Sequence, residues 1–469
     1  MSRRAFLALV LVAGLLALAP PAAAAPRQVT LRYGPIHMSP YELKRGDITY
    51  GIPTPRLDGF VTAMEADVVD GADRPVPIQR VMLHHVVFVN AGERLGERRD
   101  PSCSRYTLFD SESQLPSLGE RFFGVGEERE KGILPPGYGY PIEANDRWLM
   151  TWMLMSHRNR ADTVYIRYKV TVDDSPTLTP VRPYWLDVRN CRADPVFDVP
   201  GGGRRGSTYS QSTTWTVPET GRLVAGVGHV HGGGRKVVLS QPRCGDRTLF
   251  DSRPLWGRRS HPYYRVRPLL HEPGPISMHQ FTSGQGIPVR AGEQLRLKAS
   301  YDNHLPHTRV MGIMMLGFVA DPSADTRCTT GLPGDLNRFW LQPVGRKRTP
   351  LVRVPINGFS ARRRPGGRAG AIRRPRGRTV RLRSGSLVEV GDLYFGPRNV
   401  AVRRGSVLRW HFFGDTLHNV TLANGPRGFS SQNLSRDREF SYRFRKPGTY
   451  RLYCGLHPVR MTSTVTVKR

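Results

Sequence analysis

The chain has 469 residues, of which 39% are apolar, enough for roughly three domains of about 150 residues each. Its formal charge of +32 would suit nucleic acid or anionic surfaces, but a block of that charge falls in one segment, so nothing here favours a nucleic-acid-binding protein. Abundant glycine and proline and short alternating runs, such as TVYIRYKVTV at residues 163–172, exclude a mainly helical protein and predict an all-β fold.

The first 25 residues carry the pattern of an export signal peptide. Arg3 and Arg4 precede an apolar run at residues 5–19, and small residues follow. The run is too short to span a bilayer comfortably, so we expect no membrane span after signal removal. The opening SRRAFL also resembles a twin-arginine signal, but ordinary signals often carry two arginines, so the export route stays open. We predict a periplasmic, cell-wall-associated or secreted protein.

Two histidine pairs lie in strand-like segments of the body that follows. His84 and His85 stand together in VMLHHVVFVN, and His229 and His231 stand one residue apart in AGVGHVHGGG. Side chains at i and i+2 share one face of a strand, so His229 and His231 can bind one metal. Adjacent side chains point to opposite faces, so His84 and His85 share a metal only where the backbone is distorted. Either pair alone is a weak signal, because ordinary structural histidines also occur in pairs.

A basic segment at residues 344–378 separates the body from a small C-terminal domain at residues 379–469. Residues 346–378 hold 12 Arg or Lys and no Asp or Glu, with many glycines and prolines and no sustained apolar pattern. This composition predicts a disordered linker that would act as a flexible tether. One interpretation is that the linker binds an acidic cell-surface polymer. The other is a solvated spacer.

The C-terminal domain holds the soft and borderline ligands that copper prefers. His418 lies in DTLHNVTL, 36 positions before Cys454, and the stretch TYRLYCGLHPVRM adds His457 and Met461. A blue-copper site needs two imidazoles, a thiolate and a weak axial ligand. This set resembles the cupredoxin family of plastocyanin-like proteins, which implies a Greek-key β-sandwich with a type 1 copper. The alternative is a sandwich of the same kind that has lost its metal.

The histidines and a methionine of the body follow an order found in a second family. His157 in WMLMSHRN lies between the two pairs, and Met311 in HTRVMGIMML follows them. The set resembles the copper type II, ascorbate-dependent monooxygenases. The segments VGHVHGGG and HTRVMG resemble segments of the plant stress-up-regulated nodulin-related family. The resemblance implies two tandem jelly-roll-like β-sandwiches, at residues 26–180 and 181–343, before the cupredoxin.

The resemblance also implies a role for each of these residues. An electron-storing copper would be held by His84, His85 and His157. A catalytic copper that meets O₂ would be held by His229, His231 and Met311. Two ordinary interpretations stay open: Met311 as a core methionine, and His157 as a surface histidine. Met314 and Met315 also lie close to Met311, and alternation along a strand would point Met315, but not Met314, to the same face as Met311. The residues that grip a peptide substrate are not matched, so peptide amidation is not implied.

These features lead to one preferred function and two alternatives. The preferred function is an exported multi-copper oxidoreductase that hydroxylates a C–H bond of a small organic substrate with O₂. It would use a small reductant, the cupredoxin as a tethered electron carrier, and three coppers per chain, two of them in the body. The first alternative is a non-catalytic copper-binding or electron-transfer protein in copper handling or stress response. The second is a structural β protein with a vestigial body site and one copper.

The five cysteines are consistent with this assignment. With Cys454 as a metal ligand, four remain, an even number that suits disulfides in an oxidising compartment. A boundary near residue 180 puts Cys103 in the first sandwich and the other three in the second, so one bridge must join the sandwiches. Among the three pairings that four cysteines allow, we favour Cys103–Cys191 and Cys244–Cys328.

Overall fold

The computed structural model describes residues 25–102, 118–129, 131–191, 195–257, 274–341 and 375–469, together with the backbone of 266–267 and 352–353. Within these residues the elements are β-strands, apart from the single 3-10 turn η1 (Pro242–Cys244). No helix in this part of the chain is long and apolar enough to cross a membrane. The prediction of an all-β fold is confirmed.

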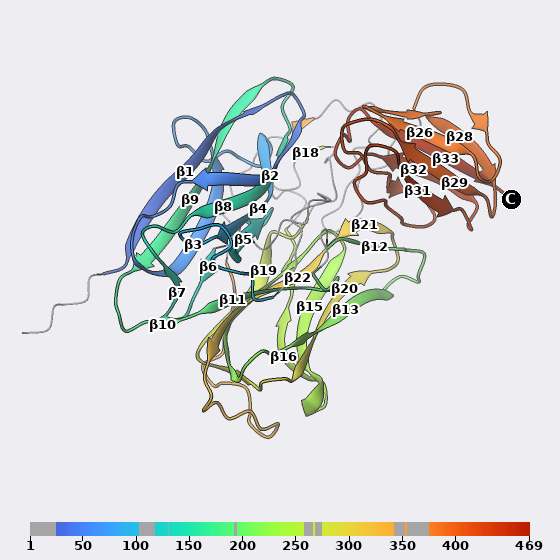
Figure 1. Ribbon diagram of the computed structural model, residues 1–469. Coiled ribbons are helices and arrows are strands. Elements are labelled where there is room, and N and C mark those ends of the chain that lie inside the picture. Colours follow the sequence, from blue (N-terminus) through green and yellow to red (C-terminus); the bar gives the residue numbers. More distant parts are fainter. Residues whose placement is uncertain are drawn as a thin grey trace, which may run out of the picture.

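Two sheets pack face to face in the N-terminal part of the body (Figure 1). One has the order β1-β9-β3-β7-β10 with β6 beside β3, and the other has the order β2-β8-β4-β5. Their strands are β1 (Arg27–Met38), β2 (Leu43–Ile52), β3 (Gly59–Val69), β4 (Val81–Asn90), β5 (Glu120–Gly126), β6 (Gly132–Ile133), β7 (Tyr138–Ile142), β8 (Trp148–Ser156), β9 (Asp162–Asp173) and β10 (Thr179–Pro180). Inward side chains at every second position of β9 form the core with those of β4 and β8.

The second part of the body repeats this arrangement. One sheet has the order β11-β22-β14-β19-β17 with β23 beside β19, a second has the order β13-β20-β15-β16, and β12 pairs with β21. Their strands are β11 (Arg182–Asp187), β12 (Phe197–Val199), β13 (Thr208–Thr216), β14 (Gly221–Val230), β15 (Gly234–Gln241), β16 (Arg247–Ser252), β17 (Pro254–Leu255), β19 (Ser277–Val289), β20 (Gln294–Asp302), β21 (His307–Val310), β22 (Gly312–Ala320) and β23 (Asn337–Trp340). The separate backbone pair β18 (Val266–Arg267) and β24 (Val352–Arg353) runs parallel.

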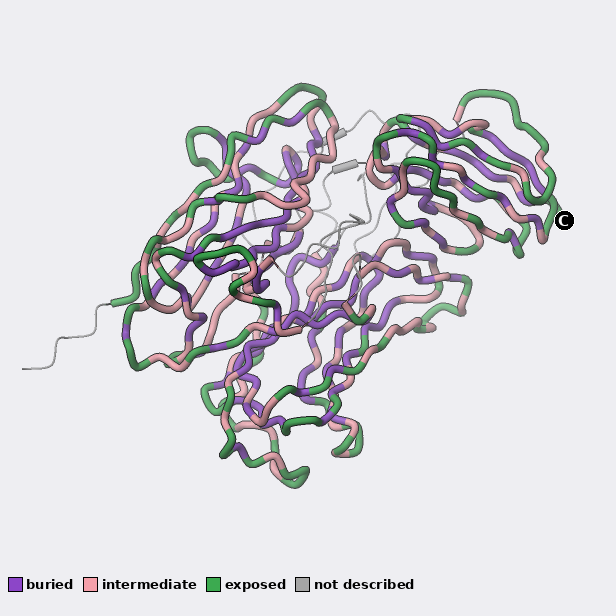
Figure 2. Tube along the Cα trace, in the orientation of Figure 1, coloured by how far each residue is buried: buried purple, intermediate pink, exposed green. Residues whose placement is uncertain are grey.

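The C-terminal domain is a smaller sandwich with mixed sheets. Their orders are β25-β28-β33-β32-β30 and β27-β26-β29-β31, and β28 runs parallel to β33. The strands are β25 (Val380–Arg381), β26 (Leu387–Gly391), β27 (Tyr394–Gly396), β28 (Asn399–Arg403), β29 (Val407–Phe412), β30 (Thr421–Asn424), β31 (Arg438–Arg443), β32 (Gly448–Tyr453) and β33 (Thr462–Lys468). Buried positions lie between the sheets and exposed positions in the outer loops, as Figure 2 shows.

The three largest hydrophobic cores of the described residues are separate from one another. They draw on residues within 36–172, 184–318 and 388–467. The domain boundaries given above stay predictions. The predicted signal peptide, except Ala25, lies outside the described residues. So does most of the predicted linker.

A disulfide joins Cys244 at the end of η1 to Cys328 beyond β22, with the Cα atoms 5.1 Å apart. This pairing was predicted from the sequence and is confirmed. The second predicted pair, Cys103–Cys191, stays a prediction because Cys103 lies outside the described residues.

Replacing Cys328 with serine is expected to lower the free energy of unfolding of the second sandwich by about 2–5 kcal/mol. The bridge closes a sequence separation of 84 residues, which restricts the unfolded chain. Denaturant unfolding followed by tryptophan fluorescence, to which buried Trp215 of this sandwich contributes, measures the change. An unchanged midpoint, with wild-type protein under reducing conditions as the control, would contradict this expectation.

Candidate metal centre

The predicted ligands of the C-terminal domain lie at the ends of three neighbouring strands. His418 lies just before β30, Cys454 directly follows β32, and Met461 directly precedes β33. Because β32 pairs with both β30 and β33, these strand ends meet at one end of the sandwich. His457 lies in the tight loop between Cys454 and Met461, where the Met461 N–H donates to the His457 carbonyl.

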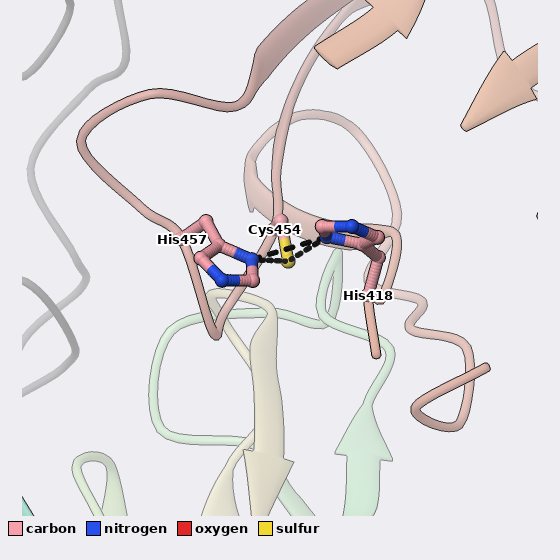
Figure 3. Close-up of side chains that lie close together, drawn as sticks. All are labelled: His418, Cys454 and His457. Carbon is pink, nitrogen blue, oxygen red and sulfur yellow. Dashed lines mark hydrogen bonds between the residues drawn. The ribbon is translucent and has the colours of Figure 1, made fainter. Parts of the chain in front are cut away.

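Three donor atoms converge at this end, as Figure 3 shows. The Cys454 Sγ lies 3.8 Å from the His418 Nδ1 and 3.7 Å from the His457 Nδ1, and the two nitrogens are 3.1 Å apart. Two nitrogens bound to one metal at about 2.0–2.1 Å are about 3.3 Å apart at a tetrahedral angle. A thiolate bound at about 2.3 Å lies about 3.6 Å from each nitrogen at that angle and about 3.8 Å at a trigonal angle. The three groups therefore have the spacing that one copper ion requires.

The outer nitrogen of His418 is held by two oxygen atoms. Its Nε2 lies 2.8 Å from the Thr416 hydroxyl and 3.3 Å from the Asp392 carboxylate. The Thr416 hydroxyl in turn donates to Asp392. A metal-binding histidine commonly donates its second N–H to a carboxylate in this way, which fixes the tautomer. The Nδ1 of His418 is thereby directed to the metal.

Burial keeps the imidazoles neutral. It is the main reason that the pKa of His457 is lowered to about 4, with His418 as a further cause. It also lowers the pKa of His418, against the attraction of Asp392. Burial raises the pKa of the Cys454 thiol, so copper must displace a proton when the thiolate forms.

Asn419 ties the two ligand-bearing segments together. Its backbone N–H lies 3.4 Å from the Cys454 Sγ, and its side-chain Oδ1 accepts from the backbone N–H of Gly455 at 2.7 Å. Its Nδ2 donates to the Asn433 side chain at 2.7 Å. The residue after the first ligand therefore holds the loop of the other ligands in place.

Met461 is fully buried in the core of this sandwich. Its carbonyl accepts from the Cys454 N–H at 3.0 Å, so the backbone of the two residues is in direct contact. Its role as the axial ligand stays a prediction.

The sequence of this domain identifies its family. A model of copper binding proteins of the plastocyanin/azurin family matches residues 385–468. The C-terminal domain is a cupredoxin. Similar solved structures include a purple cupredoxin from Nitrosopumilus maritimus (24% identity, TM-score 0.17, 18% of this chain and 99% of that chain). A second is a mutant plastocyanin of fern, with 28% identity and a TM-score of 0.17 over 18% of this chain and 99% of that chain. A third is the reduced Cu(I) form of an amicyanin mutant at pH 4, with 24% identity and a TM-score of 0.17 over 18% of this chain and 84% of that chain.

No curated protein matches the chain. The family match covers the cupredoxin and not the body, so the resemblance of the body to monooxygenases and nodulin-related proteins stays a prediction. The protein thus carries a domain suited to copper-dependent electron transfer.

In the body, a β-bulge brings His84 and His85 to the same side of β4. The register of β4 against β8 shifts between Leu83 and His85. Before the shift Val81 and Leu83 point into the core, and after it Val86 does, so both histidines face outward. Their Nδ1 atoms are 3.0 Å apart. Adjacent histidines can share a metal only where the strand is distorted, and this bulge is such a distortion.

The second pair lies at the end of β14. The ring centroids of His229 and His231 are 5.1 Å apart, and the His231 ring lies 6.1 Å from that of His84. The two predicted sites therefore meet across the two sandwiches. The His229 Nδ1 lies 3.1 Å from the Glu128 carboxylate, so this histidine would bind a metal through Nε2. Burial alone would raise the pKa of Glu128, but the attraction of His229 lowers it overall.

A cavity of about 120 Å³ lies between the body and the cupredoxin. Its body wall includes His84, His85, His231 and Met311. Met311 also belongs to a small hydrophobic cluster with Val87, Trp185 and Ile313, so its interpretation as a core methionine stays open. Met314 is buried in the core of the second sandwich, and Met315 lines a different cavity.

The structure does not bring His157 into this group. Ser156 is registered opposite Val81, so His157 lies about four residues, or roughly 13 Å, along the sheet from His84. It is buried and its Nδ1 lies 2.8 Å from the Ile78 carbonyl. Its assignment as the third ligand has no support from this geometry.

The sequence did not single out three other residues of the site, which are Glu128, Asp392 and Asn419. Glu128 and Asp392 lie far along the chain from the histidines they contact, so no spacing could have indicated them. Asn419 could have been noticed, because it directly follows the predicted ligand His418.

Replacing Asn419 with alanine is expected to lower the free energy of unfolding of the metal-depleted cupredoxin by about 1–3 kcal/mol, because the Gly455 N–H loses its acceptor. We also expect faster copper loss to a chelator. Thermal unfolding and chelator competition measure the two effects. The control is Gln432→Ala, at an exposed position nearby. If both variants retain copper equally well, Asn419 does not organise the ligand loop.

Proposed function

We propose that this protein transfers single electrons between its cupredoxin centre and the histidine group of its body. The observation that carries the proposal is a cavity between the two domains. Gly455 and Leu456, which directly follow the ligand Cys454, line it together with His84 and His85 of the body. Copper, when bound, supplies the one-electron chemistry at both ends.

Electrostatics supports a close approach of the two sites. Burial is the largest cause of the lowered pKa of both His85 and His457, and the Arg45 guanidinium adds to both shifts. One positive charge therefore acts on a histidine of each site. His457 is also partly exposed whereas His418 is buried, so His457 is the ligand on the accessible side of the cupredoxin.

Specific contacts support a docked cupredoxin in place of a loosely tethered one. Asp198 of β12 accepts from the Ser430 hydroxyl at 2.9 Å and from the Arg309 backbone N–H at 3.0 Å. The Arg309 side chain donates to the Ser431 carbonyl at 3.0 Å. The Thr308 hydroxyl donates to the Leu422 carbonyl at 2.9 Å. Figure 1 shows β12 and β21 beside the cupredoxin.

The catalytic form of the proposal is hydroxylation of a small organic substrate with O₂. Such a reaction consumes two electrons and two protons from a reductant, since R–H and O₂ become R–OH and water. A second cavity of about 130 Å³, lined mainly by apolar groups such as Trp185 and Met315, favours this form because Glu128, the partner of His229, also lines it.

The alternative is electron transfer for copper handling without catalysis. Copper-dependent O₂ consumption with an oxidised organic product separates the two forms. Export, and binding of the basic linker to an acidic cell-surface polymer, are further parts of the proposal that rest on the sequence.

Cys454→Ser is expected to slow reduction of the body site when reductant is limiting, because the thiolate that completes the cupredoxin centre is lost. Stopped-flow absorption and EPR on copper-loaded protein measure the rate. The control is Ser463→Ala, a buried hydroxyl on β33 that is not a metal donor. Equal rates in Cys454→Ser and wild-type protein would show that the cupredoxin is not the donor.

Arg309→Ala is expected to release the cupredoxin and slow electron transfer, while each site keeps its copper. Its side chain bridges to Ser431, and a lost hydrogen bond of a charged group costs about 1.5–3 kcal/mol. Small-angle scattering should report a larger radius of gyration. The control is Arg427→Ala, an exposed side chain at the same interface whose contact with Gly201 is longer, at 3.3 Å. Unchanged scattering and rate in Arg309→Ala would exclude a role for this contact in docking.

A further inference from the structure

We infer that His84 and His85 of the first sandwich and His231 of the second hold one copper ion between them, in place of two separate body sites. The inference rests on the proposed function, because the same histidines are involved, but it concerns how they are divided between metal ions. It differs from the arrangement that the sequence resemblance implies, in which each sandwich holds its own copper.

Ring distances carry the first step. A ring bound through one nitrogen at about 2.0–2.1 Å has its centroid about 3.2 Å from the metal, so two rings on one ion have centroids at most about 6.4 Å apart. The centroids of His84 and His85 are 5.1 Å apart, and those of His84 and His231 are 6.1 Å apart. In the cupredoxin the corresponding distance between His418 and His457 is 4.8 Å. His84 is thus within one-metal range of a histidine from each sandwich. The His229 ring is also close to His231, with centroids 5.1 Å apart, but His229 does not line the cavity that His84, His85 and His231 share.

The backbone supports this convergence on both sides. The bulge in β4 turns His84 and His85 outward together. His231 lies directly beyond β14, and its N–H donates to the Tyr301 hydroxyl at 2.9 Å. That hydroxyl in turn donates to the Met311 carbonyl, so one tyrosine positions the backbone of both residues on the cavity wall.

Methionine side chains, and not the predicted ligand His157, line the cavity beside His84 and His85. Met153 is registered directly opposite His85 and lines the same cavity, as Met311 does. Side chains directly opposite each other in an antiparallel pair have Cβ atoms about 4.5–5.5 Å apart, well within the reach of methionine. Thioethers favour Cu(I). The shared site therefore combines imidazoles from two sandwiches with soft donors, and we expect it to hold Cu(I) more tightly than Cu(II).

Copper counting on variants from each sandwich tests the inference. The parent is the double variant His418→Ala/Cys454→Ser, in which the cupredoxin centre lacks two of its donors, and copper that stays bound after gel filtration is measured by metal analysis and EPR. The comparison uses His84→Ala, His231→Ala and, as the control, His157→Ala. One shared ion predicts one equivalent in the parent, its loss in both His84→Ala and His231→Ala, and its retention in His157→Ala.

Each other result has a defined meaning. Two equivalents in the parent, with one lost in each of His84→Ala and His231→Ala, would overturn the shared site and leave the proposed function standing. Retention of the single copper by either variant would also overturn it. No copper bound by the body of the parent would instead overturn the proposed function. Where an alanine variant is less stable than the parent in a thermal melt, His84→Gln and His231→Gln replace it.

Discussion

Asp198 lies where the second sandwich meets the cupredoxin, and the direction in which the copper-binding loop faces depends on what this carboxylate binds. It accepts from the Arg309 backbone on its own side and from the Ser430 hydroxyl across the interface. With these bonds in place, Gly455 and Leu456 lie on the wall of the cavity that also contains the body histidines. A cupredoxin docked at another angle would turn a different surface to the body, so the proximity of the two candidate sites follows from this contact together with those of Thr308 and Arg309.

The cavity keeps its donors in the protonation state that a metal requires. Burial is the main cause that lowers the pKa of His84 to about 4, as it also lowers that of His457. An imidazolium ion would be poorly solvated there, so the rings are neutral near neutral pH and their nitrogens can bind a cation. Glu128 is the exception among the nearby groups, since His229 stabilises its carboxylate. This pairing is typical of the outer partners of metal-binding histidines.

Sequence reasoning succeeded where donors lie close along the chain. Cys454 and His457 share one loop, so their spacing alone predicted that they meet, and the family's order of ligands added His418. For His84 and His85 it identified the condition, a distorted strand, but could not predict that the distortion occurs. A bulge depends on the register between β4 and β8, which neither strand encodes alone. His157 was predicted to be the third ligand beside His84 and His85. The register between β4 and β8 instead places Met153 opposite His85.

The alternating apolar pattern of this sequence determined an all-β chain, since a strand buries one face by placing every second side chain inward. The residue types and spacing near the C-terminus indicated a cupredoxin and named the three donors His418, Cys454 and His457 that the fold brings together. Only the tertiary structure decided that His84 approaches His231, that Glu128 supports His229, and that the cupredoxin covers the cavity. These contacts join separate sheets, and their geometry follows from how whole sandwiches pack. Neither the hydrophobic periodicity of single strands nor the spacing of residues along the chain determines that packing.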